Sequence, residues 1–134
     1  MPGFARLKDK EFVAAMQSCN RAIQNPVFFA AFFGAPVFLV IATVLHYGQS
    51  PRFWLLLAAT LIYITGVFGV TVAGNVPLNN ALDRFDLEAA NNEEIARQRA
   101  SFERRWNYLN TIRTVSSTLV VILVAASIAE TQTK

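Results

Sequence analysis

The residues best suited to chemistry in this sequence are asparagines, a tryptophan and an arginine that border long apolar stretches. Asn75 and Asn79 follow directly on a charge-free apolar run, and Trp106, Asn110 and Arg113 precede another. The i, i+4, i+7 spacing of these last three places them on one face if the segment is helical. Amide and guanidinium groups are costly at an apolar boundary unless they are hydrogen-bonded. We therefore expect them to pair with one another or to bind the oxygens of a ligand.

The first of these groups lies in the stretch Gly74-Asn75-Val76-Pro77-Leu78-Asn79-Asn80. Asparagine favours turns, and Pro77 lacks a backbone donor and disfavours helix at the residue before it. The local pattern therefore predicts a helix end at a membrane surface. A second interpretation makes the stretch the lining of a polar pocket, and the rest of the chain has to decide between the two.

The composition predicts a membrane protein with a single domain over residues 1–134. Hydrophobic residues make up 54% of the chain and charged residues 16%, which is more apolar than an ordinary soluble domain. No Asp, Glu, Lys or Arg occurs in residues 22–51 or 53–82, and such runs are typical of transmembrane helices. We predict an all-α transmembrane bundle with three spans, at residues 26–45, 53–73 and 110–129.

An amphipathic segment, residues 1–24, precedes the first span. We expect it to lie as a helix against the bilayer or the bundle, because apolar residues recur in it at helical spacing; these are Phe12, Met16, Cys19 and Ile23. Asn25-Pro26 then gives a helix start, since proline suits the first helical position.

A second polar segment, residues 81–109, precedes the third span and is predicted to be helical and cytoplasmic. Asn91-Asn92-Glu93-Glu94 indicates a turn followed by a helix start. The charge-free part of the third span, Thr114 to Ala129, is only about 24 Å long at 1.5 Å per residue. We therefore extend the span back to Asn110, which places Arg113 near the headgroups.

The distribution of basic residues predicts the orientation in the membrane. Ten of the twelve Lys and Arg residues lie on the side that holds the N-terminal segment and residues 74–113, whereas Arg52 and Lys134 lie on the other. Because Lys and Arg concentrate in cytoplasmic loops, the asparagine-rich side is predicted to be cytoplasmic and the C-terminus to be outside, in the inner or plasma membrane of the cell.

Several functional classes are excluded by composition. The single cysteine, Cys19, and the single histidine, His46, rule out an internal disulfide and metal sites built on several Cys or His ligands, so we predict no metal site. No phosphate-binding glycine loop occurs, and no arginine-rich strip interleaved with aromatics points to a nucleic-acid partner. His46 is expected to cap the end of the first span or to face water.

Three antiparallel spans would gather the polar groups on the cytoplasmic side. These groups are Asn20 and Asn25 before the first span, Asn75 and Asn79 after the second, and Trp106, Asn107, Asn110 and Arg113 before the third. In one interpretation they pair with one another and lock the bundle. In the other, a flat apolar molecule sits between the helices and its oxygens meet Asn and Arg donors. The expected partners are thus the lipid bilayer and such a small molecule.

Two motifs resemble the anthrone oxygenase-like integral membrane family. One is the run Thr71-Val72-Ala73-Gly74-Asn75-Val76-Pro77-Leu78-Asn79. The other is Phe102-x-x-Arg105-Trp106-Asn107-x-x-Asn110-x-x-Arg113, in which Asn107 directly after the tryptophan departs from the family pattern. Met1-Pro2-Gly3 and the residues up to Pro26 also resemble the family's first loop, so the resemblance covers nearly the whole chain.

This resemblance implies a bundle of four spans, in which a first helix precedes the Met-Pro-Gly sequence. We therefore expect a further helix upstream of Met1; the alternative is that translation starts at Met1 and only three spans exist. Characterised relatives oxidise anthrones to anthraquinones without an evident metal or flavin, so the resemblance implies no cofactor.

Two hypotheses follow. The first is a cofactor-independent oxygenase of phenolic or polyketide-like substrates, with catalytic residues that bind an oxyanion (Asn75, Asn79 and Arg113) and substrate-binding residues around them (Asn20, Asn25, Trp106, Asn107 and Asn110). Its weakness is the base, because His46 is expected on the opposite membrane face. The second is a non-catalytic small membrane protein or subunit whose Asn/Arg cluster is structural.

Overall fold

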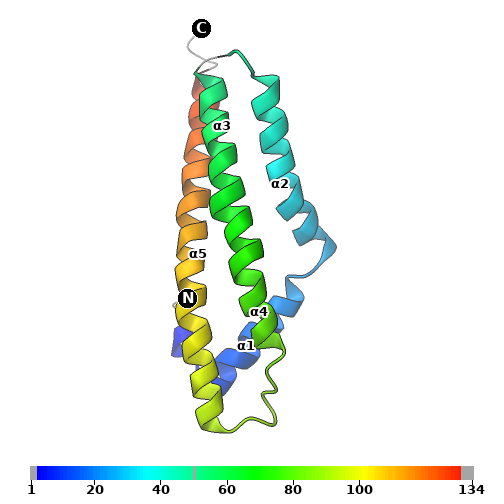
Figure 1. Cartoon of the computed structure of the whole chain (residues 1–134), viewed down its shortest axis with the longest axis vertical. Coiled ribbons are helices and arrows are strands. Elements are labelled where there is room, and N and C mark those ends of the chain that lie inside the picture. Colours follow the sequence, from blue (N-terminus) through cyan, green and yellow to red (C-terminus); the bar gives the residue numbers. More distant parts are fainter. Residues whose placement is uncertain (1–2, 50, 131–134) are drawn as a thin grey trace.

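The described part of the chain, residues 3–49 and 51–130 of a computed structural model, consists of helices joined by short connections. Three long helical rods stand side by side, and α1 lies across one end of them (Figure 1). We call this the α1 end, and the end where α2 leads into α3 the far end. The rods are long and apolar enough to cross a membrane, which confirms the predicted all-α bundle with three spans. Met1 and Lys134 lie outside the described residues.

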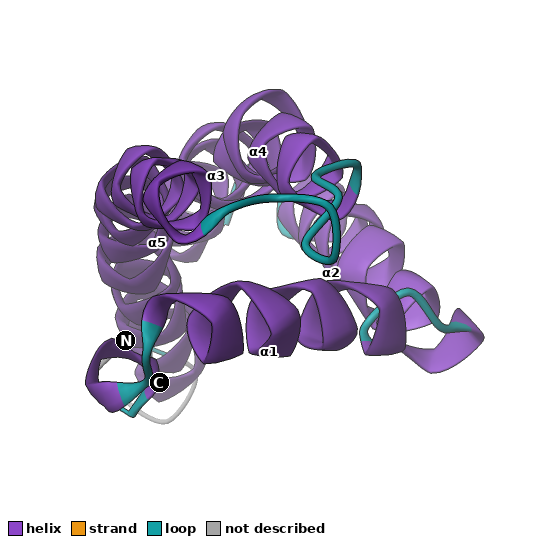
Figure 2. Cartoon of the chain, turned by 90° about the horizontal axis from the view of Figure 1, so that it is seen from below, coloured by secondary structure: helices purple, strands orange, loops and turns teal. Residues whose placement is uncertain are grey.

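The elements are, in chain order, the 3₁₀ turn η1 (Phe4–Arg6), α1 (Asp9–Ala22), α2 (Pro26–Leu45), α3 (Arg52–Ile62), the π-helical segments η2 (Tyr63–Gly69) and η3 (Thr71–Asn75), α4 (Val76–Asp83) and α5 (Asn92–Ala129). The first rod is α2, the second runs from α3 through α4, and the third is α5. Figure 2 looks at the α1 end and shows α1 lying across the bundle from α5 toward α2.

The first rod begins and ends on side-chain caps. Asn25 is the N-cap of α2 and its side-chain oxygen accepts a hydrogen bond from the Phe28 amide at 3.0 Å, while Pro26 occupies the first turn, as the sequence predicts. At the other end the His46 ring Nδ1 hydrogen-bonds the Ala42 carbonyl at 2.8 Å, which confirms the predicted capping role. Most apolar side chains of α2 are exposed, as suits a lipid-facing helix.

The second rod does not stop where the sequence predicts a helix end. It continues without a break from Arg52 to Asp83, so the prediction of a helix end within residues 74–80 is wrong. The physical reason lies in the backbone before Pro77. Proline has no N–H and its ring crowds the carbonyl four residues earlier. Because η3 is π-helical up to Asn75, the turn before Pro77 is wider and leaves room for the ring. Proline is thereby tolerated inside the rod.

The third rod is a single helix of 38 residues, about 57 Å at 1.5 Å per residue. It starts at a capping box, in which Asn91 accepts from the Glu94 amide at 3.0 Å and the Glu94 carboxylate accepts from the Asn91 amide at 2.9 Å. Because a hydrocarbon core is about 30 Å thick, roughly half of α5 can extend beyond the membrane. The predicted polar helix and the predicted third span are therefore one element.

The best-buried core lies at the α1 end. Phe12, Val13 and Met16 of α1 pack with Leu82 of α4 and Phe102 of α5, and the Phe12 and Phe102 rings meet edge to face with centroids 6.4 Å apart. Of the predicted apolar face, Phe12 and Met16 are buried as expected, whereas Cys19 and Ile23 are exposed. The reason is that the buried face of α1 is turned toward Val13, Gln17 and Asn20, so it includes two polar residues.

Two polar anchors hold α1 in place. Gln17 donates both amide hydrogens, to the Leu82 and Phe85 carbonyls at 2.9 Å each. Arg99 of α5 donates to Asp9 at 2.9 Å and to Glu103 at 3.0 Å, and its guanidinium lies 4.5 Å from the centre of the Phe12 ring. These contacts fix α1 against both α4 and α5.

The far end is closed by a different set of polar contacts. The Thr43 hydroxyl of α2 and the Thr60 hydroxyl of α3 hydrogen-bond each other at 2.9 Å, and both are buried. Arg52 donates to the Ser127 carbonyl of α5 at 3.1 Å. Between the two ends the second and third rods approach closely at Gly66, where an added Cβ would lie 2.2 Å from the Ser116 hydroxyl oxygen.

Candidate polar site at the α1 end

A polar stripe on the second rod faces α1. Asn75, Asn79 and Leu82 are spaced i, i+4 and i+7, so they share one helical face. Leu82 is fully buried in the core and its carbonyl is bound by Gln17 of α1. Asn79 and Asn75 therefore lie one and two turns farther from the α1 end on that same face. Asn75 is 2% exposed.

A second stripe runs down α5. Phe102, Trp106 and Arg113 follow one another at intervals of four and seven residues, which keeps them on one face. Phe102 packs against Phe12 of α1, and the Trp106 ring follows with its centroid 6.5 Å from that of Phe102. Arg113 lies about two turns deeper, in electrostatic reach of the Tyr63 hydroxyl on the second rod. The α5 stripe thus faces the second rod as well as α1.

The third wall of the site is α1 itself. Asn20 follows the anchoring residue Gln17 by three positions and lies on the same buried face of α1. It is 7% exposed. The next residue, Arg21, pairs with Asp83 at the end of α4, so Asn20 lies near the end of the second rod.

The polar groups of this site are buried without hydrogen-bond partners. Within residues 3–49 and 51–130, six buried side-chain atoms make no hydrogen bond: Asn20 Nδ2, Asn75 Nδ2 and Oδ1, Asn79 Oδ1, Trp106 Nε1 and Arg113 Nε. All six belong to residues predicted to form the site. An unsatisfied buried polar group costs about 1–3 kcal/mol. We call Asn20, Asn75, Asn79, Trp106 and Arg113 the polar cluster.

The other three predicted site residues are placed differently. Asn25 is exposed and its side chain caps α2, so it does not join the cluster. Asn107 and Asn110 are half-buried on α5, and Asn107 has an interaction partner. Neither contributes an atom to the buried unpaired set.

Sequence reasoning missed Tyr63. It lies at the start of η2 and is half-buried, in reach of Arg113. The spacing of polar residues indicates that Tyr63 belongs to the same face. Multiples of four residues separate Tyr63, Thr71, Asn75 and Asn79, and Thr71 and Asn75 are buried. In a straight α-helix this stripe would drift around the axis, but the wider π turns of η2 and η3 counteract the drift.

The family comparison bears directly on these residues. The anthrone oxygenase family matches residues 26–123, a range that contains α2, the whole second rod and most of α5. The chain belongs to the anthrone oxygenase family. Among the curated proteins and the solved structures, no match to the chain was found.

In this anthrone oxygenase family member the matched range includes four of the five cluster residues, and Asn20 on α1 lies before it. The cluster offers amide, indole and guanidinium hydrogen-bond donors beside an aromatic ring. Within the described residues, no group of three or more His, Cys, Asp and Glu side chains could hold a metal ion. The chemistry available to the site is therefore hydrogen bonding to ligand oxygens, stacking, and stabilisation of a negative charge.

Proposed function

We propose that this protein is a cofactor-independent oxygenase of phenolic or polyketide-like aromatic substrates, which bind in the polar cluster. The observation that carries the proposal is the set of six buried, unpaired polar atoms on three converging elements. Buried polar groups are nearly always hydrogen-bonded in proteins. Ligand oxygens would accept hydrogen bonds from the four nitrogen atoms, and a phenolic hydroxyl would donate to the Asn75 and Asn79 amide oxygens. Family membership points to an anthrone-like ligand.

The cluster residues divide into three roles. Asn75, Asn79 and Arg113 donate hydrogen bonds to the oxygen that becomes negatively charged when the substrate ionises. Trp106 stacks on the flat ring system, and Asn20 closes the site from α1. Tyr63, which is half-buried on the second rod, adds a hydroxyl that can bind a second substrate oxygen. Asn107 and Asn110 border the site on α5.

The proposed reaction converts a ring methylene and dioxygen into a carbonyl and water. A ring methylene between two aromatic rings loses a proton, and the resulting enolate transfers an electron to dioxygen. The substrate radical and superoxide combine to a peroxide anion, which takes up a proton in place of the one released in the first step and becomes a hydroperoxide. The hydroperoxide loses water and leaves a carbonyl, so that CH₂ and O₂ become C=O and H₂O. The donors lower the energy of the enolate, and the water-poor site excludes competing reactions of the radical pair. His46 is not the base, because it caps α2 at the far end.

We further propose that the protein lies in the cell membrane with the α1 end in the cytoplasm. The basic residues of α1 and of the first half of α5, together with Arg84 just after α4, support this orientation, because Lys and Arg are retained on the cytoplasmic side. A substrate made in the cytoplasm would then reach the cluster from the inner leaflet.

The proposal is tested with purified protein in detergent, an anthrone and ¹⁸O₂. We expect one ¹⁸O atom in the new carbonyl and loss of turnover by a factor of about 10²–10³ in Asn75→Ala, the magnitude typical of removing one oxyanion donor. Asn80→Ala is the matched control, because Asn80 is an exposed asparagine on the same helix. It should keep the wild-type rate.

Two results would contradict the proposal. Turnover by the wild-type protein no faster than by an Asn75→Ala, Arg113→Ala double variant would leave no catalysis to explain. If those substitutions instead lowered the melting temperature by several degrees in a protein without turnover, the structural alternative would hold, in which the cluster only ties the bundle.

A further inference from the structure

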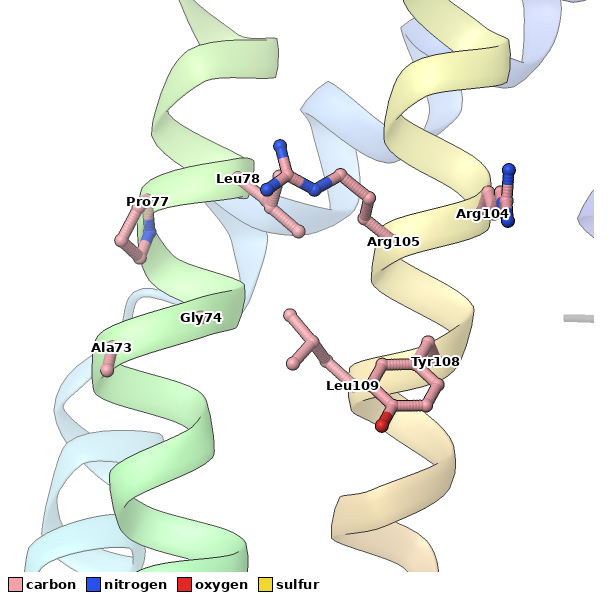
Figure 3. A pocket seen from close by; sticks show the side chains of 8 residues that line it. All are labelled: Ala73, Gly74, Pro77, Leu78, Arg104, Arg105, Tyr108 and Leu109. Atoms are coloured by element: carbon pink, nitrogen blue, oxygen red, sulfur yellow. The ribbon is translucent and has the colours of Figure 1, made fainter.

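A groove of about 890 Å³ opens between the second rod and α5, on the face beside the polar cluster (Figure 3). Its walls come from the chain neighbours of cluster residues: Gly74 and Leu78 on one side, and Arg105 and Leu109 on the other. Because neighbouring positions on a helix point about 100° apart, this groove is a second surface, distinct from the cluster.

The end of the groove nearest α1 is basic. Arg105 extends from α5 toward Leu78, and Arg104 lies at the other edge of the helix (Figure 3). Both are exposed, and neither has an ion pair or hydrogen bond within the described chain. No Asp or Glu lines the groove. Arg99, one or two turns earlier, is by contrast satisfied by Asp9 and Glu103.

The other end of the groove is apolar and closed at its floor. A Cβ added to Gly74 would lie 2.8 Å from a methyl carbon of Leu109, so the missing side chain at Gly74 lets Leu109 lie close against the second rod. Ala73 and Pro77 continue this wall. Tyr108 lies at the rim and is 69% exposed.

The two ends of the groove match the two parts of a lipid. The arginines precede the charge-free part of α5 by about three turns, and the neighbouring Trp106 and Tyr108 are residues typical of a membrane interface. Guanidinium groups bind phosphate through two parallel hydrogen bonds. The apolar walls then continue toward the hydrocarbon.

We propose that this groove binds one anionic phospholipid, with its headgroup phosphate on Arg105, with Arg104 adding positive charge at the other edge of the helix, and with an acyl chain along Leu78, Gly74 and Leu109. The unpaired charge at one end and the closed apolar floor at the other fit this occupant. A zwitterionic lipid would bring a second cation to the two arginines, so the groove selects for net negative charge. This site does not depend on the proposed oxygenase activity.

The test measures lipid retention by native mass spectrometry. Wild-type protein in a neutral detergent is mixed with equal amounts of phosphatidylglycerol and phosphatidylcholine. We expect phosphatidylglycerol to be retained preferentially, and the preference to fall about tenfold in the Arg104→Gln, Arg105→Gln variant, as for the loss of one charged hydrogen bond. Arg97→Gln, which removes an exposed arginine from the same helix, is the matched control and should retain phosphatidylglycerol as the wild type does.

A second variant tests the apolar wall. Ala73→Trp fills the groove without removing a charge and should lower phosphatidylglycerol retention while both arginines remain. Equal retention of the two lipids by the wild type, or unchanged retention in either groove variant, would overturn the proposal. Displacement of the lipid by an equal concentration of glycerol phosphate would also overturn it, because the groove would then recognise a free phosphate and not a lipid.

Discussion

The two ends of the bundle treat their buried polar groups in opposite ways. At the far end Thr43 and Thr60 bond each other and also the Leu39 and Leu56 carbonyls, and Arg52 binds the Ser127 carbonyl. At the α1 end the polar cluster keeps six buried atoms without a partner. Where buried polar groups tie helices together, the chain therefore supplies their hydrogen-bond partners. The unpaired groups fit a site that is completed by a ligand.

The α1 end also contains groups that do tie helices together, and they lie outside the cluster. Arg99 and Gln17 hold α1 to α5 and α4 through hydrogen bonds. Paired anchors thus lie at both ends of the bundle and an unpaired cluster at only one, and four measurements test this difference.

The largest expected effect on stability is at the Arg99 anchor. Arg99→Ala leaves Asp9 and Glu103 without their partner and removes the cation above the Phe12 ring, so we expect a loss of about 3 kcal/mol and faster hydrogen exchange in α1. Arg97→Ala breaks only an exposed pair with Glu93 and should cost less than about 0.5 kcal/mol. Equal effects of the two changes would show that Arg99 is not an anchor.

The next largest loss of stability is expected in the middle of the bundle, where the second and third rods approach closely. Gly66→Ala places a methyl group where Ser116 lies and should cost about 2 kcal/mol through overpacking, measured as a lower melting temperature in detergent. Gly34→Ala is the matched control, since its added Cβ would be 3.7 Å from Phe38, an ordinary contact. A Gly66→Ala protein as stable as Gly34→Ala would contradict the close approach.

A smaller effect is expected at the far end. Thr60→Val removes the hydroxyl that bonds Thr43 and should cost about 1 kcal/mol, the upper part of the range for hydrogen bonds between membrane helices. The pairwise energy is measured by a double-mutant cycle with Thr43→Val. A coupling energy of zero would mean that the far end is not held by this pair, and the contrast between the ends would weaken.

The smallest effect, and the most discriminating, is expected at the cluster. Asn75→Leu replaces an unpaired buried amide by an apolar group of similar size, so stability should stay within about 0.5 kcal/mol of the wild type or rise, because the desolvation penalty of the amide disappears. A loss as large as that of Thr60→Val would break the comparison, since Asn75 would then be a structural tie.

Much of the fold could be predicted from the sequence because its signals are local. Asn25-Pro26 and the Asn91/Glu94 pair start helices through contacts within four residues, and charge-free runs mark the rods. Most of the cluster was also predictable, because antiparallel rods leave few places where polar side chains from their ends can meet. Asn20, Asn75, Asn79, Trp106 and Arg113 are all buried or half-buried there.

What could not be predicted depends on longer-range packing or on backbone geometry. Asn25 was expected in the site, but its side chain is used by the helix cap. The helix end expected near Pro77 is missing because the preceding turns are π-helical, and single-residue preferences do not reveal that. Tyr63 was missed for the same reason, since its alignment with Asn75 depends on those wide turns. The face of α1 that packs on the bundle is selected by the Gln17 and Arg99 contacts.

The wide turns between Tyr63 and Asn75 also make this rod unusually tolerant of a change in length. Deleting one residue from Tyr63–Gly69 could be absorbed if the π segment tightened into an ordinary α-helix, so the rod would still cross the bilayer. Because a π turn holds about one residue more than the α turn that would replace it, Asn75 and Asn79 would keep nearly the same direction relative to Trp106 and Arg113. A deletion within α3, which is an ordinary α-helix, has no such reserve and would rotate both asparagines by about 100°. The effect of a lost codon on the polar cluster therefore depends on which part of the rod loses it.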